Sequence, residues 1–394
     1  MTLPRFLQIH TLHNYPAALL NRDDAGLAKR LPYGDAIRTR VSSQCLKRRW
    51  RTADDAFALK NLDVPMAVRS RETLRLIKDR LQAVNVAEPL AQIAAEGLRA
   101  AGLVDKGKDL KGEEALETNQ AVLMGYAEIE YLVQRCAALA ADHAEEEDLK
   151  AAIAAFLKRE KENLEALRLG SGLESALFGR MVTSDVLTSR DAAVYVAHSF
   201  TVHEAQVESD YFTVVDDILR EEGEAGSAGI FDTELTSGLY YGYTVIDVPQ
   251  LIANLEGVNI KDWDKCSNEQ RELAGRVVQN ILHLIATISP GAKRGSTAPF
   301  EWAKFMLVEA GDWQPRSLAG AFQSALPQRG GDIRRLAVNR LADEIASIDA
   351  AYGASTERRY LAVDDISIPS ATRMPLQELA SWARKAVTCA NTEV

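Results

Sequence analysis

Positively charged side chains are concentrated in one short segment of the chain, residues 20–51. The segment holds nine Lys or Arg residues against three Asp residues, a net charge near +6, whereas the whole chain of 394 residues carries −10. A cationic cluster on an otherwise acidic protein indicates a specific site for a polyanion. Its cations are Arg22, Lys29, Arg30, Arg38, Arg40, Lys47, Arg48, Arg49 and Arg51.

A predicted helix would present part of this charge. Ser42 and Ser43 are typical N-cap residues, and they predict a helix over residues 43–52. A helix that begins there would direct backbone N–H groups and two hydroxyls toward a phosphate, with Gln44 beside them. Three cations follow along the helix: Lys47, Arg48 and Arg51. This pattern favours the binding of backbone phosphates over a reaction centre.

A second candidate is the glycine-containing loop at residues 291–296, with the sequence GAKRGS. It resembles a phosphate loop superficially, but it lacks the GK[ST] ending, and Pro299 prevents the helix that such a loop requires. A nucleotide-hydrolysing loop is therefore not expected. Lys293 and Arg294 are either phosphate contacts or part of a solvated loop.

The histidines and acidic residues offer weaker patterns. His198 and His203 lie five residues apart, which is not an HExxH motif, and on a strand their rings would point to opposite faces. Asp210, Asp216 and Asp217 invite a metal-nuclease interpretation, but the acidic run continues beyond them, as in a solvated acidic surface. We expect no catalytic residue, no bound metal and no cofactor.

The bulk composition is that of an ordinary globular protein, with 47% hydrophobic and 26% charged residues. Neither a signal segment nor a run of membrane-spanning length is visible, so we expect a cytoplasmic protein without a membrane partner. The cysteines are far apart and form no CxxC pair, which argues against a zinc site and against a disulfide framework. They are Cys45, Cys136, Cys266 and Cys389.

The elements that must position these residues form a mixed α+β pattern. Residues 71–169 are rich in Ala, Leu and Glu and predict an inserted all-helical subdomain. Without the insertions, the remaining order is strand, helix, strand, strand, helix, strand, which is the ferredoxin-like order of RNA-recognition modules. The predicted strands are 5–12, 192–202, 239–248 and 305–308; the predicted helices are 43–52, 269–289, 333–352 and 376–389.

Six segments spread over most of the chain carry a family resemblance. They are LNRDD (20–24), RVSSQ (40–44), LKR (46–48), ALFGRMVTSD (176–185), AHSFTVHEAQVESDYFTVVDD (197–217) and PGAKRGSTAPF (290–300). In sequence and order they resemble the CasC family, which supplies the backbone subunit of type I-E CRISPR Cascade surveillance complexes.

The resemblance implies a hand-like subunit with a ferredoxin-like (RRM-like) palm, helical fingers and a β-hairpin thumb. Residues 1–60 would form the first part of the palm, 61–180 the fingers, and 181–394 the second part of the palm with a thumb at about 208–238. The resemblance also places Lys293 and Arg294 on the RNA-facing side and implies a guide contact at Gly179-Arg180-Met181. By residue type alone, Met181 would be buried and Arg180 would be a surface charge.

We expect a non-catalytic subunit that binds CRISPR guide RNA (crRNA) through phosphate contacts independent of sequence. The resemblance implies further partners: neighbouring copies stacked head to tail, other Cascade subunits, and the target DNA strand that pairs with the guide. Two alternatives are a ferredoxin-like CRISPR-associated ribonuclease and an assembly scaffold without RNA contact. The candidate RNA-binding residues are Arg22, Lys29, Arg38, Arg40, Ser42, Ser43, Gln44, Lys47, Arg48, Arg51, Arg180, Met181, Lys293 and Arg294.

Overall fold

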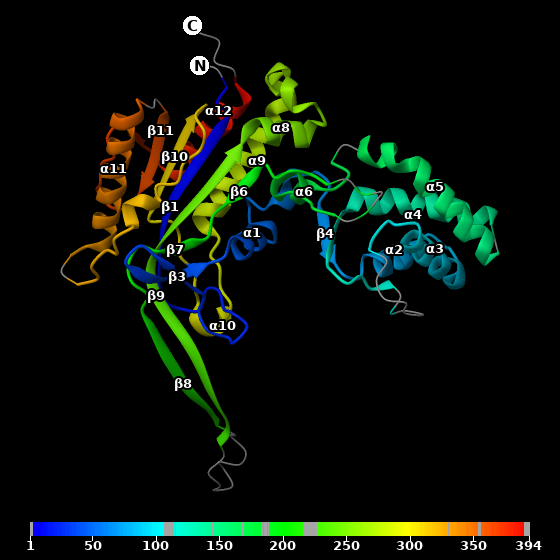
Figure 1. The fold of residues 1–394 in the computed structure, drawn as a ribbon, viewed down its shortest axis with the longest axis horizontal. Coiled ribbons are helices and arrows are strands. Elements are labelled where there is room, and N and C mark those ends of the chain that lie inside the picture. Colours follow the sequence, from blue (N-terminus) through cyan, green and yellow to red (C-terminus); the bar gives the residue numbers. More distant parts are fainter. Residues whose placement is uncertain are drawn as a thin grey trace. The chain divides into compact units, whose positions relative to one another are not determined.

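The chain forms two compact units in the computed structural model (Figure 1). The first unit comprises Met1–Leu59, Tyr195–Ile246 and Gly275–Val394, and the second comprises Lys60–Val194 and Asp247–Ala274. The second unit thus extends beyond the predicted range 61–180 and also includes residues 181–194 and 247–274. The structure describes residues 3–105, 114, 116–143, 145–166, 169–182, 184, 187, 189–215, 227–329, 331–353 and 356–389.

The first unit is built on a large, mostly antiparallel sheet. Its strands lie in the order β12-β11-β10-β1-β9-β7-β3-β2, and β6 and β8 also pair with β9. Every residue of Phe6–Leu12 in β1 is buried; since successive side chains point to opposite faces, both faces of the sheet are covered there. The strands are β1 (Phe6–Ala18), β2 (Arg30–Tyr33), β3 (Ala36–Val41), β6 (Val194–Val196), β7 (Ser199–Thr201), β8 (Val207–Val215), β9 (Ser227–Asp247), β10 (Phe305–Gly311), β11 (Glu357–Ala362) and β12 (Thr372–Arg373).

Helices cover the two faces of this sheet. On one face, Leu12 and Leu307 share a buried cluster with Val338 and Leu341 of α11. On the other face, α12 contacts β10 and β11, and the end of α9 approaches β1. These helices are α9 (Asn268–Thr287), α11 (Ile333–Tyr352) and α12 (Leu376–Thr388); the shorter ones are α1 (Ser43–Arg51), α10 (Arg294–Thr297) and the 3-10 turn η4 (Ala319–Phe322).

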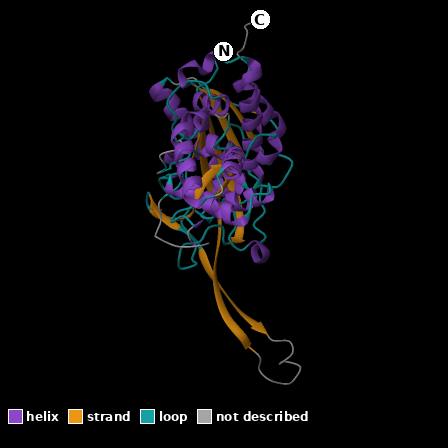
Figure 2. Ribbon diagram, turned by 90° about the vertical axis from the view of Figure 1, so that its right-hand side faces the viewer, coloured by secondary structure: helices purple, strands orange, loops and turns teal. Residues whose placement is uncertain are grey.

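A two-stranded ladder extends beyond the sheet (Figures 1 and 2). It is made by β8 and the first part of β9, whose antiparallel register runs from Val207↔Thr236 to Val215↔Ser227. The acidic stretch that joins the two strands, including Asp216 and Asp217, lies outside the described residues.

The sequence predicts a loop before the basic helix, broken by Gly26, Pro32 and Gly34. This prediction is wrong in part, because residues 30–41 form the hairpin β2–β3. Pro32 lies in β2, the edge strand, where a missing N–H costs least. Gly34 makes the turn with φ +62°, and a Cβ there would lie 1.6 Å from the carbonyl oxygen of Gln323. The predicted strand at 192–202 is also divided, since β6 ends before Ala197 and β7 begins at Ser199.

The second unit has a helical core but is not all-helical. Leu74, Ala94, Leu132 and Ile153 of four successive helices share one buried apolar cluster. The strands β4 and β5 pair in antiparallel register beside it, and each is only four residues long, too short to show a period in the sequence. The elements are β4 (Ala67–Ser70), β5 (Val122–Gly125), α2 (Thr73–Ala83), α3 (Glu88–Ala100), α4 (Tyr126–Asp142), α5 (Glu146–Ala166), α6 (Leu173–Phe178), α8 (Val248–Glu256), η3 (Ile260–Lys265) and, at the boundary between units, η1 (Leu59–Leu62).

Within the described part of the chain, no helix combines the length and the apolar character needed to cross a membrane.

Candidate nucleic-acid interface

The basic helix α1 begins where the sequence predicts. Ser42 is its N-cap: the Ser42 hydroxyl accepts a hydrogen bond from the Cys45 N–H (3.3 Å), and the Ser42 N–H donates to Asn21 Oδ1 (2.9 Å). The Ser43 hydroxyl donates to Gln44 Oε1 (3.3 Å). Both serines are buried and Gln44 is exposed, so the two hydroxyls stabilise the helix start internally and Gln44 is the polar side chain presented to solvent.

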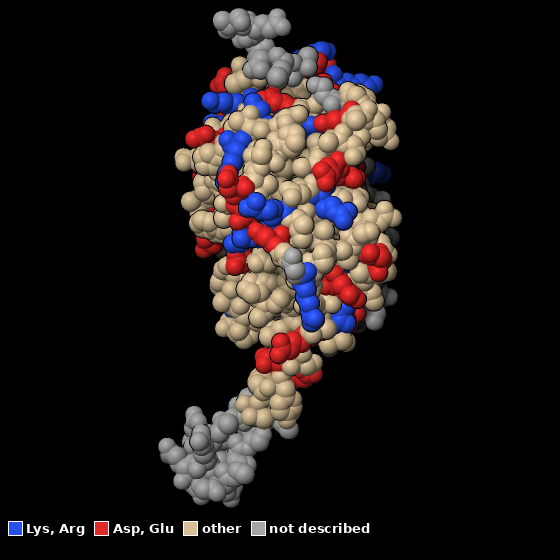
Figure 3. Space-filling model, turned by 90° about the vertical axis from the view of Figure 1, so that its left-hand side faces the viewer, with Lys and Arg blue, Asp and Glu red and all other residues tan. Residues whose placement is uncertain are grey.

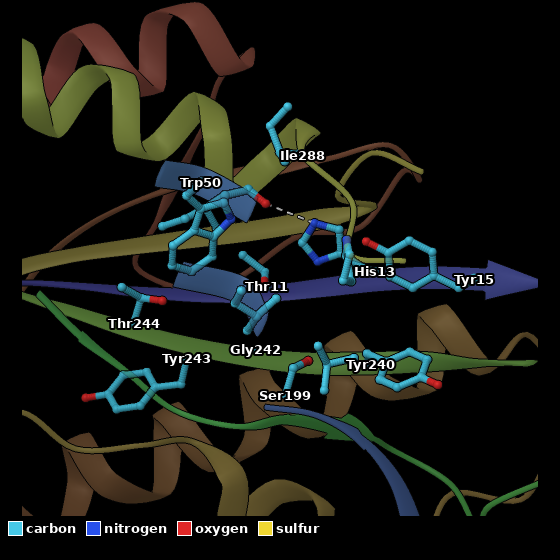
Figure 4. A pocket seen from close by; sticks show the side chains of 14 residues that line it. Thr11, His13, Tyr15, Trp50, Ser199, Tyr240, Gly242, Tyr243, Thr244 and Ile288 are labelled. Atoms are coloured by element: carbon cyan, nitrogen blue, oxygen red, sulfur yellow. Dashed lines mark hydrogen bonds between the residues drawn. The ribbon is translucent and has the colours of Figure 1, made fainter. Parts of the chain in front are cut away.

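Packing of Trp50 holds α1 against the sheet. Trp50 is buried and lines a small cavity of about 30 Å³, the size of a single water site, together with Thr11, His13 and Tyr240. Figure 4 shows Thr11, His13 and Tyr15 of β1 at this pocket; the dashed line is the hydrogen bond from His13 Nε2 to the Ile285 carbonyl. With Trp50 inside, the cations of α1 differ in their exposure. Arg48 is exposed, and Lys47, Arg49 and Arg51 are partly buried.

The segment before β2 is a small closed turn that leaves Arg22 accessible. Asp23 accepts two hydrogen bonds there: its carboxylate binds the Leu27 N–H (2.9 Å) and its carbonyl binds the Gly26 N–H (3.2 Å). Arg22 forms a backbone bridge with Ala28, and its side chain is exposed. Asp23 therefore acts as a turn residue, while the Arg22 guanidinium faces solvent.

Lys29, Arg40 and His198 form a second group of basic side chains. The Arg40 guanidinium donates to the Arg30 carbonyl (3.3 Å) and to His198 Nδ1 (3.0 Å). Partial burial lowers the pKa of His198, and the charges of Arg40 and Lys29 lower it further. A neutral His198 thus orients Arg40 without adding a competing charge.

The loop at 290–297 lies against α1, which the sequence alone could not show. The Arg49 guanidinium donates to the Gly291 carbonyl, and the Ala292 N–H donates to the Leu19 carbonyl (2.8 Å). Burial lowers the pKa of Arg49, and the nearby charge of Arg294 lowers it further. Two cationic segments that are far apart in the sequence therefore share one site.

The cations of this loop also contact aromatic rings. The Lys293 amino group donates to the Thr233 hydroxyl and lies 5.8 Å from the centre of the Phe212 ring. Arg294 lies 4.9 Å from the centre of the Phe300 ring. Lys293 thereby connects the loop to the base of the β8–β9 ladder. We use the term cationic face for the site formed by Arg22, Lys29, Arg40, Lys47, Arg48, Arg49, Arg51, Lys293 and Arg294.

Arg38 does not belong to the cationic face, and its assignment as a phosphate ligand needs correction. Its side chain is fully buried and donates to the carbonyls of Tyr33 (3.3 Å), Thr201 (3.3 Å) and Phe322 (2.9 Å). Arg38 thus joins three chain segments, and a phosphate could reach it only if these bonds were broken.

In the second unit, the expectations from residue type for Arg180 and Met181 are reversed. The Arg180 guanidinium is buried and forms two hydrogen bonds with Glu128 (2.7 and 2.9 Å), while its backbone pairs with that of Arg190. Met181 is 92% exposed. Arg180 therefore serves as an internal anchor that holds Met181 at the surface, and the guide contact implied for this segment would fall to Met181.

Of the residues considered for catalysis, Asp216 and Asp217 lie outside the described part of the chain, and His203 has a structural environment. His203 is buried, with Nδ1 bonded to the Glu204 carbonyl (2.7 Å) and Nε2 accepting from the Leu239 N–H (3.2 Å). Among the described residues, no group of three His, Cys, Asp or Glu side chains is placed to hold a metal ion. Figure 3 shows one side of the molecule, on which acidic and basic side chains are interspersed.

Comparison with known proteins places these features in context. The fold matches a chain of a solved structure titled "CRISPR RNA-guided surveillance complex, pre-nicking", with a TM-score of 0.77 and 26% sequence identity over 96% of this chain and 100% of that chain. A second structure, titled "CRISPR RNA-guided surveillance complex", shows the same fold, with a TM-score of 0.64 and 22% identity over 96% of this chain and 99% of that one. No curated protein matches the sequence. A family model matches residues 7–384, so the protein belongs to the family of CT1975-like proteins.

Proposed function

We propose that this protein is the non-catalytic backbone subunit of a type I-E CRISPR surveillance complex and binds crRNA through its cationic face. The observation that carries the proposal is the convergence of α1 and the 290–297 loop, through the Arg49–Gly291 contact. Chains of CRISPR RNA-guided complexes share the fold along the whole length, which supports the same setting for this protein. Phosphate contacts without base contacts suit a subunit that must accept any guide sequence.

The topology supports a hand-like description of this subunit. In chain order, the four central strands are β1, β7, β9 and β10. In the sheet they lie side by side in the order β10-β1-β9-β7, which is the strand order of a ferredoxin-like palm. The β8–β9 ladder suits a thumb, and the helical second unit suits fingers. Neighbouring copies would stack head to tail along the guide, a heterologous contact that extends into a helical filament and leaves guide bases free to pair with target DNA. Other Cascade subunits would cap this filament.

Charge removal on the cationic face tests RNA binding. We expect Arg22→Ala, Lys47→Ala and Arg48→Ala each to weaken crRNA binding regardless of sequence, and to lower the slope of log K against log salt by about 0.7 for each lost phosphate contact. Fluorescence anisotropy of labelled crRNA at several salt concentrations measures both quantities.

The matched control replaces cations on the far helix α11. Arg335 and Arg340 are exposed there, and the double variant Arg335→Ala/Arg340→Ala removes the same kind of charge. An equal loss of affinity in the control would contradict a localised interface. Unchanged assembly of the triple variant Arg22→Ala/Lys47→Ala/Arg48→Ala would favour the scaffold alternative, and cleavage of labelled crRNA by the purified protein with Mg²⁺ would favour the ribonuclease alternative.

A further inference from the structure

Two large aromatic side chains lie exposed directly beside the cationic face. Phe300 is 63% exposed and Trp302 is 70% exposed, and both follow the 290–297 loop in the chain. Exposed rings are common singly, but two of them on one short segment, next to clustered cations, suggest a binding surface. Pro299 and Ala303 are the buried side chains between this loop and β10, whereas the two rings lie mostly in solvent.

The backbone of this segment is fixed so that the two rings face outward. The Glu301 N–H donates to the Ser289 hydroxyl and the Glu301 carbonyl accepts from it (both 2.9 Å), while the Ala303 N–H donates to the Ala286 carbonyl (2.8 Å). The alternate residues, Phe300 and Trp302, are left on the solvent side. Flat aromatic rings exposed in this way can stack on the faces of bases.

A groove continues from Trp302 along the surface of the first unit. It encloses about 660 Å³ and is lined by Thr287, Ala303, Lys304, Val363 and Met374 in addition to Trp302. Most of this lining is apolar, which suits the face of a base or ribose and gives little for a phosphate to bind. Two cations line the groove: Lys304 pairs with Glu301 (2.7 Å) and Arg373 pairs with Asp365 (3.3 Å), so a carboxylate offsets each of these charges.

The cations available to the backbone of such a strand lie on the loop side. Arg294 contacts the Phe300 ring at 4.9 Å, so the phosphate-binding loop and the aromatic pair are continuous. Proteins that bind single strands combine these two features: cations follow the phosphates, and aromatic rings stack on the bases.

We propose that Phe300, Trp302 and the adjoining groove form a stacking site for bases of a single-stranded nucleic acid whose phosphates contact Lys293 and Arg294. This inference rests on the proposed function for the phosphate contacts, and it adds a site at which aromatic rings stack on bases. Guide RNA and single-stranded DNA share this chemistry, and the experiment separates them.

The test measures anisotropy of labelled 30-mers of uridine and of thymidine with the full-length protein. We expect Trp302→Ala and Phe300→Ala each to weaken binding about tenfold, the effect of losing one stacked base, with an unchanged salt slope. The matched control is Trp313→Ala, which removes a ring that is 53% exposed at the other end of β10. A larger loss with uridine assigns the site to RNA, and a larger loss with thymidine assigns it to DNA.

A strand with abasic positions supplies the decisive comparison, because it keeps the phosphates and lacks bases. Trp302→Ala and the wild type should bind this strand equally. Equal binding of Trp302→Ala and Trp313→Ala to the intact strand would overturn the stacking site alone, as would a Trp302→Ala defect that persists on the abasic strand. A loss of self-association by Trp302→Ala in sedimentation without nucleic acid would instead assign the surface to a contact between copies. Failure of the wild type to bind any strand would overturn the proposed function as well.

Discussion

Arg22 and Arg38 belong to the same cationic segment, yet their environments are opposite. Arg22 is exposed, whereas Arg38 is fully buried and donates to three backbone carbonyls. A buried guanidinium stabilises the fold only while its donors are satisfied, and its removal leaves the carbonyls without partners. The two residues should therefore respond to the same substitution in opposite ways.

We expect Arg38→Met to lower the free energy of unfolding by about 2–4 kcal/mol, because it leaves buried carbonyls unsatisfied. Arg22→Met should change stability by less than about 0.5 kcal/mol, as surface substitutions do. Urea unfolding measures both. Arg22→Met should weaken crRNA binding more than Arg38→Met does. The folded fraction of Arg38→Met should retain the wild-type salt slope. A stable Arg38→Met protein with a reduced salt slope would instead indicate that Arg38 contacts a phosphate.

At the scale of elements, glycine conformation decides whether the β2–β3 hairpin can close. Gly34 and Gly26 both have positive φ, +62° and +88°, in the same basic segment. A Cβ at Gly34 would collide with the Gln323 backbone, whereas a Cβ at Gly26 would meet no atom within 4 Å. Only the first position combines backbone strain with a steric clash that no side-chain movement can relieve.

Gly34→Ala should therefore destabilise the protein by more than about 3 kcal/mol, whereas Gly26→Ala should cost about 1–2 kcal/mol from the left-handed conformation alone. Thermal unfolding of the two variants gives the comparison. Because β3 carries Arg40 and leads into α1, Gly34→Ala should also weaken crRNA binding at temperatures below its unfolding transition. Similar melting temperatures for the two variants would show that the turn can move away from Gln323.

The elements that the sequence predicted well have local signals. Asp332 caps α11 through the N–H groups of Arg334 and Arg335, Gly353 ends it, and the predicted range 333–352 agrees with the helix. Ser42 does the same for α1. The sequence did not predict the hairpin β2–β3, because Pro32 and Gly34 are typical of a loop. Only the structure shows that Pro32 lies in an edge strand and that Gly34 makes a tight turn.

Which charged residues are exposed at the site was harder to predict, because this depends on contacts with residues that are far away in the sequence. The sequence shows that Arg180 is charged but not that Glu128 lies beside it, and so it could not show that Met181 is the exposed member of the pair. The contact between Arg49 and Gly291 likewise joins segments separated by most of the chain. Charge clustering predicted the cationic segment, whereas the distinction between its exposed cations and the buried Arg38 required the fold.

At the scale of the whole molecule, buried titratable groups make the stability of the first unit depend on pH. Burial lowers the pKa of His10, and Glu309, to which His10 Nε2 bonds (3.1 Å), offsets only part of this effect. Burial alone would raise the pKa of Glu309, but the hydrogen bonds of His10 and Arg316 hold it well below its usual range. In both cases the unfolded chain binds protons more readily than the folded one, so acid favours unfolding.

His13 offers the clearest measurement of this effect. Burial lowers its pKa from 6.5 to about 4, and its neutral ring donates to the Ile285 carbonyl (3.1 Å). A group with a lowered folded-state pKa contributes stability that is present above pH 6.5 and is lost as the pH falls toward 4; here the loss is about 3 kcal/mol, at about 1.4 kcal/mol per pKa unit. His13→Gln can keep the donor but cannot titrate, so its free energy of unfolding should fall less than that of the wild type between pH 7 and pH 4.

The control is Tyr15→Phe, which changes another side chain at the same cavity without removing a group that titrates between pH 7 and pH 4, and it should follow the wild-type pH dependence. Urea unfolding at each pH, monitored by tryptophan fluorescence, provides the curves. Trp50 of α1 lines the same cavity as His13. Protonation of His13 should therefore weaken the packing of α1 against the sheet. The affinity for crRNA should then decline together with stability below pH 6.5 in the wild type, and less steeply in His13→Gln. Parallel pH curves for His13→Gln and the wild type would show that His13 is protonated without cost in the folded state and that α1 does not depend on it.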